Sequence, residues 1–300
     1  MELKTQVNHK KVFSTIGLAL FIGMGVTKIV SKLLYKLADI IDLSSKPWVP
    51  IAITVIDLYL IGFPIFILIV NKLPDGELRE SKKLSVGGII KVCIIGVATG
   101  TLFFIVSSII NSLITSLIGS EVTSGVGELV GENSVILTFM VVGIIGPIVE
   151  ELMFRKYVIN KTRQYGDKIA IFTSGILFGL FHGNLEQVFY TAAMGAFLAY
   201  VTLKTGTIKY AIIAHIFNNS LTVLTTTLIS LGLSESMINN IFFAFIVVGL
   251  ILFIINRKKI KLLKGEIELE KGTAFSVTCL NIGMILFFIH ALVEIIQGLL

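Results

Sequence analysis

Four polar side chains in otherwise apolar stretches have the chemistry needed to hydrolyse a peptide bond: Glu150, His182, His215 and Asn219. A carboxylate and an imidazole that meet on one water molecule can remove its proton and make it a nucleophile. A second imidazole and a carboxamide can donate hydrogen bonds to the oxyanion of a tetrahedral intermediate. These residue types suit a peptidase that attacks its substrate with water and forms no acyl-enzyme.

The spacing around these residues predicts which side chains meet. Residues four apart share one face of a helix, so Glu151 and Arg155 can form an ion pair, and Phe178 can pack beside His182. Glu150 is turned by about 100° from Glu151, so we expect it to point elsewhere, into a cavity. His215 and Asn219 also share a face and could offer two polar groups to one ligand.

A metal centre is the alternative chemistry. One carboxylate and two histidines form a common catalytic zinc set, which makes Glu150, His182 and His215 alternative zinc ligands. The sequence lacks the His-Glu-x-x-His signature of zinc peptidases, and its two cysteines lie in apolar runs without metal-ligand spacing. We therefore expect water activation without a metal or other cofactor.

Purely structural interpretations also exist for each of these residues. Glu151 and Arg155 could be only an ion pair at a helix end, and His182 could cap a helix before Gly183. His215 and Asn219 could be hydrogen-bonding residues between membrane helices. We favour the catalytic interpretation for Glu150, His182, His215 and Asn219, because ionisable residues inside membrane spans are costly and usually functional.

The elements that must position these side chains are membrane helices. Hydrophobic residues make up 55% of the 300 residues, charged residues only 15%, and mean hydropathy is +0.92, whereas a soluble domain has roughly a quarter charged residues. The composition predicts an all-α, polytopic transmembrane helical bundle in the cell membrane, a single domain over 1–300 with eight or nine spans. Nine candidate spans lie near 12–34, 49–71, 86–115, 135–160, 168–185, 186–203, 208–231, 238–256 and 273–297.

The charge pattern predicts how the chain is oriented. The formal net charge is +6, but its basic residues lie in short loops between apolar runs, which favours a membrane protein and not a nucleic-acid partner. Most of the 25 Lys and Arg residues lie on one side if the N-terminus is cytoplasmic, and the acidic loop at 116–134 then lies outside. Lys28, Lys32 and Lys36 oppose this bias, and we place them on an interfacial stretch after the first span.

Three motifs occur in order: Glu150-Glu151-x-x-x-Arg155, Phe178-x-x-x-His182 and His215-x-x-x-Asn219. They resemble the motifs of the CAAX protease and bacteriocin-processing family, also called the Abi family or type II CAAX endopeptidases. The resemblance covers about residues 140–225. It implies a four-helix catalytic core there, with flanking transmembrane helices in 1–134 and 226–300.

The resemblance also implies a role for each motif residue. Glu150 would be the general base that activates water with help from His182, and His215 and Asn219 would stabilise the oxyanion. The supporting residues that shape the site would be Glu151, Arg155 and Phe178.

From these roles we expect an intramembrane endopeptidase acting on a membrane-associated protein or peptide, in bacteriocin, pheromone or CAAX-type processing. The alternative is a non-enzymatic membrane regulator or a bacteriocin self-immunity protein. A third hypothesis is a transporter that uses Asp57 and Glu294, but no inverted repeat supports it. An Ile- and Lys-rich composition favours a bacterial peptide substrate. The sequence leaves open the cleaved bond, the oligomeric state and any need for a prenylated substrate.

Overall fold

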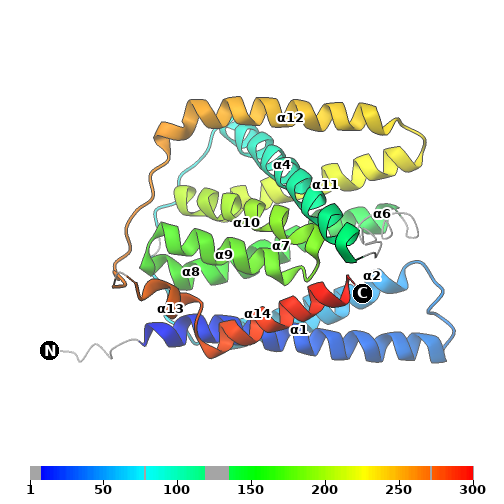
Figure 1. The fold of residues 1–300 in the computed structure, drawn as a ribbon, viewed down its shortest axis with the longest axis horizontal. Coiled ribbons are helices and arrows are strands. Elements are labelled where there is room, and N and C mark those ends of the chain that lie inside the picture. Colours follow the sequence, from blue (N-terminus) through cyan, green and yellow to red (C-terminus); the bar gives the residue numbers. More distant parts are fainter. Residues whose placement is uncertain (1–7, 78, 119–134, 271, 300) are drawn as a thin grey trace.

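The computed structural model describes residues 8–77, 79–118, 135–270 and 272–299, and all regular elements in these ranges are helices (Figure 1). Seven helical stretches are long and apolar enough to cross a membrane. The chain is therefore a multi-pass membrane protein, and the predicted all-α helical bundle is confirmed. The seven stretches are His9–Ile40 (α1), Val49–Val70 (α2, η1 and α3), Val86–Ile118 (α4), Val135–Tyr165 (α6 to η4), Leu185–Thr205 (α10), Lys209–Ser230 (α11) and Glu235–Lys259 (α12 and η5).

Two shorter helices bring the count close to the eight or nine predicted spans. They are α9 (Asp167–Phe181) and α14 (Ile282–Gln297), the latter preceded by the short α13 (Ala274–Thr278). The third predicted span, near 86–115, is one continuous helix, α4. The first span continues to Ile40, about 48 Å at 1.5 Å per residue, so its last turns extend beyond a hydrocarbon core of about 30 Å.

The helices are arranged in layers along one direction, with α1 and α14 on one side, α12 on the opposite side and the α9–α10 hairpin between them (Figure 1). Helix α14 runs parallel to α1: the Gly283 N–H donates to the Ser14 hydroxyl, and near their other ends Glu294 forms an ion pair with Lys28. A core of aromatic and aliphatic side chains joins α1, η3, α9 and α14, and includes Phe13, Phe154, Phe178 and Phe287.

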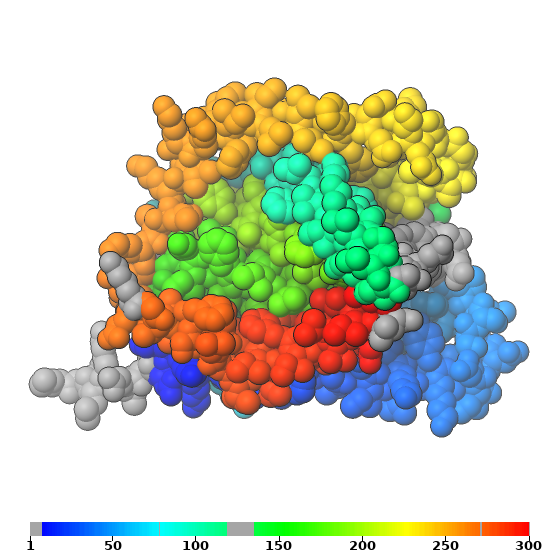
Figure 2. Space-filling model, in the orientation of Figure 1, coloured from blue at the N-terminus to red at the C-terminus, as the bar shows by residue number. Residues whose placement is uncertain are grey.

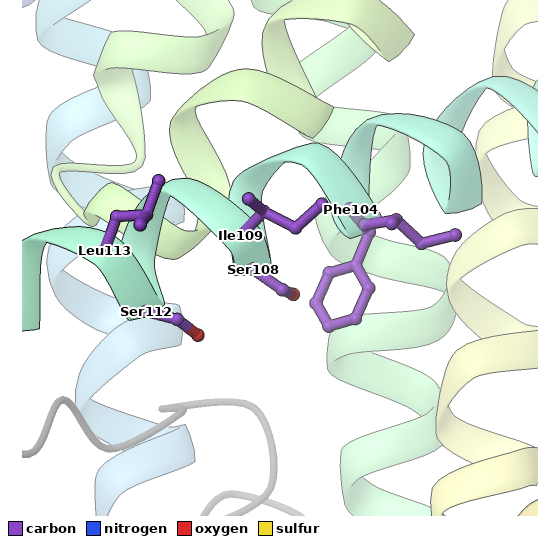
Figure 3. A pocket seen from close by; sticks show the side chains of 6 residues that line it. Phe104, Ser108, Ile109, Ser112 and Leu113 are labelled. Atoms are coloured by element: carbon purple, nitrogen blue, oxygen red, sulfur yellow. The ribbon is translucent and has the colours of Figure 1, made fainter. Parts of the chain in front are cut away.

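Many large apolar side chains remain exposed on α4 and α12, as expected for helices whose solvent is lipid. Figure 2 shows α4 and α14 at the front of one face, with the α9–α10 hairpin between them. Six side chains of α4, from Phe104 to Leu113, line a mostly apolar hollow of about 420 Å³ (Figure 3). A hollow formed by one apolar helix fits a surface that faces acyl chains.

The break predicted at His182-Gly183-Asn184 separates α9 from α10. Gly183 has φ +58°, in the left-handed region that glycine adopts without strain. The Asn184 side chain then caps α10 by accepting from the Glu186 N–H. At about 1.5 Å per residue, the 15-residue α9 is about 22 Å long, which is shorter than a hydrocarbon core of about 30 Å.

Small residues let α9 and α10 approach closely. A Cβ on Gly179 would lie 2.6 Å from the Val188 carbonyl oxygen and 2.7 Å from the Ala192 Cβ, and one on Gly175 would lie 2.9 Å from the Ala192 carbonyl oxygen. Glycines four apart facing small residues are a typical contact between membrane helices.

We expect Gly179→Ala to destabilise the protein by about 1–3 kcal/mol, because the added methyl group must push against backbone atoms of α10. The matched control is Gly25→Ala, since Gly25 is also helical but a Cβ there meets nothing within 4 Å. Thermal unfolding of purified protein in detergent measures the difference. Equal midpoints for the two variants would contradict the close packing of the hairpin.

The basic loops meet at one end of the bundle. The Lys82 N–H donates to the Thr205 carbonyl, Arg79 forms an ion pair with Asp167, and the Leu263 N–H donates to Asp167. The ring of His9 contacts Tyr165, so α1 begins at the same end. Loops grouped by the charge pattern are thus neighbours in space. That this end is cytoplasmic stays a prediction, and the acidic residues of the loop at 116–134 lie outside the described residues.

Candidate active site

Glu150 and Glu151 end the short helix α7 (Gly146–Glu151), which lies between two π-helical segments, η2 (Phe139–Ile145) and η3 (Leu152–Val158). The Gly146 N–H bonds to the Val141 carbonyl, five residues earlier, and Pro147 has no N–H to donate. The carbonyls of Val142 and Gly143 therefore lose their usual helical partners. Widened turns of this kind are frequent at functional sites.

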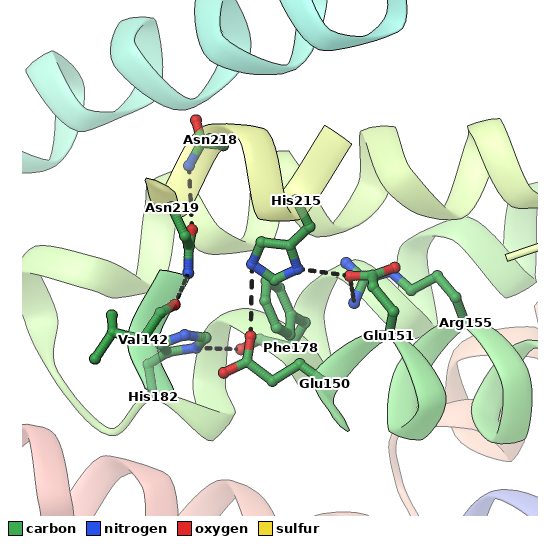
Figure 4. A network of polar contacts seen from close by, with 9 residues as sticks. All are labelled: Val142, Glu150, Glu151, Arg155, Phe178, His182, His215, Asn218 and Asn219. Atoms are coloured by element: carbon green, nitrogen blue, oxygen red, sulfur yellow. Dashed lines mark hydrogen bonds and ion pairs between the residues drawn. The ribbon is translucent and has the colours of Figure 1, made fainter. Parts of the chain in front are cut away.

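Helix α11 supplies the missing donors. The Asn219 side-chain amide donates to the Val142 carbonyl at 3.2 Å, and the Ser220 hydroxyl donates to the Gly143 carbonyl at 3.4 Å (Figure 4). A buried carbonyl without a partner costs about 1–3 kcal/mol, so these bonds fix α11 against η2. They also fix the position of His215 relative to α7, because His215 lies one helical turn before Asn219 on the same helix.

His215 lies between the two carboxylates. Its Nδ1 is 2.8 Å from Glu151 Oε1, and its Nε2 is 3.6 Å from Glu150 Oε2 (Figure 4). An ionised carboxylate only accepts, so Nδ1 carries a hydrogen. On the other side of the ring, His215 Nε2 and Glu150 Oε2 would repel each other if neither carried a hydrogen. One hydrogen therefore lies between them, on the imidazole or on the carboxyl group.

Glu151 and Arg155 form the predicted ion pair, with 3.2 Å between Glu151 Oε1 and Arg155 Nη1, and both side chains are completely buried. The guanidinium carbon lies 4.4 Å from the centroid of the Phe178 ring, a cation–π contact. Gly195 of α10 makes room for this stack, because a Cβ there would lie 2.9 Å from Phe178 and 3.2 Å from Arg155.

His182 follows α9 and packs beside Phe178, as predicted: the two ring centroids are 4.9 Å apart and the ring planes nearly perpendicular. Its Nδ1 lies 2.8 Å from the Phe178 carbonyl oxygen. Because a carbonyl can only accept, Nδ1 carries the hydrogen, and Nε2 of the neutral ring keeps a lone pair. The same Phe178 ring meets the His215 imidazole, with 5.7 Å between centroids.

The fold thus brings together Glu150, Glu151, Arg155, Phe178, His182, His215 and Asn219 from α7, η3, α9 and α11 (Figure 4). Glu150 keeps 17% of its side chain exposed, whereas Glu151 is inaccessible. Within the described parts of the chain, no three His, Cys, Asp or Glu side chains are grouped as a metal site. Whether the site needs zinc stays a question for chelation.

Three further residues contribute to the site and were not predicted from the sequence. Pro147 frees the carbonyls that α11 binds, and Gly195 provides space for the Arg155 stack. Glu294 of α14 lies against the turn after His182, since a Cβ on Gly183 would be 3.1 Å from the Glu294 Cβ. Pro147 lies three residues before the first motif, and a proline inside a predicted helix is a sequence signal for such an interruption. That His215 and Asn219 contact one ligand stays a prediction. In the structure His215 bonds to Glu151, and Asn219 donates to the Val142 carbonyl.

Comparison with known proteins places this site in a family. Residues 132–221 match the type II CAAX prenyl endopeptidase family described as Rce1-like. This part of the chain is similar to the CAAX protease family. It is also 32% identical over 96 residues to a protein of Bacillus subtilis (strain 168) named "Putative membrane peptidase YdiL". The aligned segment is 31% of this chain and covers 38% of that relative's length. No solved structure matches the chain.

The matched segment includes α7, η3, α9, α10 and most of α11, and all seven candidate residues lie within it. Helices α1 to α4 and α12 to α14 lie outside it. They nevertheless contact the segment, because Glu294 packs on the Gly183 turn and Asn218 lies 3.4 Å from the position a Cβ of Gly100 in α4 would take.

Proposed function

We propose that this CAAX protease homologue is an intramembrane endopeptidase that hydrolyses a peptide bond of a membrane-associated peptide or protein. The observation that carries the proposal is the buried chain Arg155–Glu151–His215–Glu150, which ends at a partly exposed carboxylate beside His182. Each member holds the next in place, so Glu150 is presented to a water molecule in a fixed orientation. Preorganised groups of this kind contribute most when the site excludes bulk water.

In the proposed reaction Glu150 accepts a proton from water, and the lone pair of His182 Nε2 helps to orient and polarise that water. The oxygen attacks the substrate carbonyl carbon. As the base, Glu150 starts ionised, so the proton between it and His215 lies on His215 Nε2. Once Glu150 is protonated, the oxyanion accepts hydrogen bonds from this Nε2–H and from the Asn219 amide, only one of whose two hydrogens faces Val142. Glu150 then returns the proton to the departing amine as the carbon–nitrogen bond breaks.

The nature of the substrate follows from where the site lies. The site lies among helices that are long and apolar enough to cross a membrane, so we infer that the scissile bond belongs to a membrane-associated chain. Peptide maturation, such as bacteriocin or pheromone processing, and CAAX-type trimming both fit this requirement.

The proposal is tested with purified protein in liposomes and a library of membrane-associated peptides read by mass spectrometry. We expect wild-type protein to cleave members of the library and His182→Ala to cleave them about 10²–10⁴-fold more slowly, the usual contribution of a proton-transfer group. His9→Ala is the matched control, because His9 contacts Tyr165 at the end of the bundle. Equal cleavage by wild type and His182→Ala would contradict the proposal.

We expect cleavage to survive treatment with a metal chelator, since the proposed chemistry uses protein groups alone. The measurement is the same peptide assay after chelation and removal of the chelator. Activity lost on chelation and restored by zinc would instead assign Glu150, His182 and His215 as zinc ligands.

A further inference from the structure

A polar cavity lies at the end of the bundle where the basic loops meet, next to the start of α8 (Ile159–Thr162) and the end of α10. Its volume is about 250 Å³. Four cationic side chains line it, and no acidic residue does: Arg79, Arg155, Lys156 and Arg163. Two of the charges are balanced from outside the cavity, because Asp167 pairs with Arg79 and Glu151 pairs with Arg155. The lining therefore keeps a positive excess.

Two lining groups are buried without hydrogen-bond partners. Among the described residues, none of the three guanidinium nitrogens of Arg155 has a hydrogen-bond acceptor in suitable geometry, although Glu151 is close enough to pair its charge. The Thr202 hydroxyl is also unpartnered, and this residue is 6% exposed. The buried Glu151 Oε2 is also unpartnered, so the ion pair keeps an acceptor of its own for Arg155. Buried polar groups nearly always have partners, so the Thr202 hydroxyl leaves a donor for an acceptor bound in the cavity.

The other lining residues indicate which kind of ligand would carry that acceptor. Arg163 already donates to the Gly76 carbonyl, whereas Lys156 is exposed and free to reach a ligand. The apolar residues Ile159, Leu203 and Ile208 also line the cavity. A group with several anionic oxygens next to an apolar portion satisfies both parts. Basic pockets between membrane helices at one bilayer surface typically bind phospholipid headgroups.

We propose that this cavity binds a phosphate group, with Lys156 and the Thr202 hydroxyl as direct donors and the buried Arg155 supplying charge at its inner end. The same chemistry has two sources, an anionic phospholipid headgroup or free inorganic phosphate. A bound phosphate also sits at one end of the chain that runs from Arg155 through Glu151 to His215. The cavity therefore shares Arg155 with the candidate active site, and its other lining residues lie outside that site.

The test uses the full-length protein in detergent and native mass spectrometry to count bound lipids. Phosphatidylglycerol is titrated with phosphatidylcholine as the neutral comparison, and a parallel thermal-unfolding series adds inorganic phosphate at constant ionic strength. Lys156→Gln and Thr202→Val are the test variants. Lys168→Gln is the matched control, because Lys168 is an exposed cation at the same end but does not line the cavity.

We expect phosphatidylglycerol to bind wild type and Lys168→Gln equally, and Lys156→Gln about tenfold more weakly, as for a lost charge-assisted hydrogen bond. Thr202→Val should also bind more weakly. Stabilisation by inorganic phosphate with the same dependence on Lys156 would support the site and assign free phosphate to it. Binding of either probe that is unchanged in both test variants, or weakened equally by Lys168→Gln, would overturn the proposal.

Discussion

Replacing Glu150 with glutamine is expected to abolish peptide cleavage, lowering the rate by about 10²–10⁴-fold, while the protein still folds. Glutamine has the shape of the carboxyl group, but it cannot take a proton from water. The side chain is partly exposed and has no buried ion pair to lose apart from its contact with His215 at 3.6 Å. The loss should therefore appear in turnover and leave thermal stability nearly unchanged.

The measurement is cleavage of a peptide identified in the library experiment, alongside the unfolding midpoint of the same preparation. Glu235→Gln is the matched control, because Glu235 is an exposed carboxylate at the start of α12, far along the chain from the site. Turnover of Glu150→Gln within a few-fold of wild type would remove Glu150 from the role of general base. A large drop in its unfolding midpoint would instead indicate a structural role.

The second large effect concerns stability. Arg155→Met should destabilise the protein by about 3–5 kcal/mol, because it leaves the fully buried Glu151 carboxylate without its positive partner. Methionine fills much of the same volume and can still pack on Phe178, so the lost charge dominates. The double variant Glu151→Gln with Arg155→Met removes both charges and should recover much of the loss.

Thermal unfolding of the single variants and the double variant forms a double-mutant cycle that isolates the coupling. Arg257→Met is the control, since Arg257 is an exposed arginine at the end of α12. If the double variant were as unstable as the sum of its parts, the buried pair would carry no coupling energy. The recovered double variant is expected to stay slow in cleavage, because His215 then loses its ionised partner at Nδ1.

Much of the fold could be predicted from the sequence, because lipid imposes a simple rule on it. Each predicted span overlaps a helical segment, and the break at Gly183 followed from three polar residues between apolar runs. The pairs Glu151–Arg155 and Phe178–His182 followed from four-residue spacing alone. Helix spacing predicts only contacts between residues of the same helix, and it was sufficient for these two pairs.

The rest depended on contacts between helices, which spacing does not encode. That His215 bridges both carboxylates is a matter of the depth and rotation of α11 against α7. The bond from Asn219 to the Val142 carbonyl depends on the π-helical turn at η2. There each N–H bonds five residues back instead of four, which leaves the Val142 carbonyl without a helical donor. Glu294 was an isolated acid in sequence, and only the parallel packing of α14 on α1 brought it to Lys28 and the Gly183 turn.

The α9–α10 hairpin also bears on which side of the membrane the loops before and after it lie. Gly166, before α9, lies against the loop at Gly265, and Gly206, after α10, lies against Glu80, so both ends of the hairpin return to the end where the basic loops meet. An element that leaves and re-enters one surface does not change the sidedness of anything downstream. Counting it as two spans or as one re-entrant unit therefore leaves every other loop on the same side.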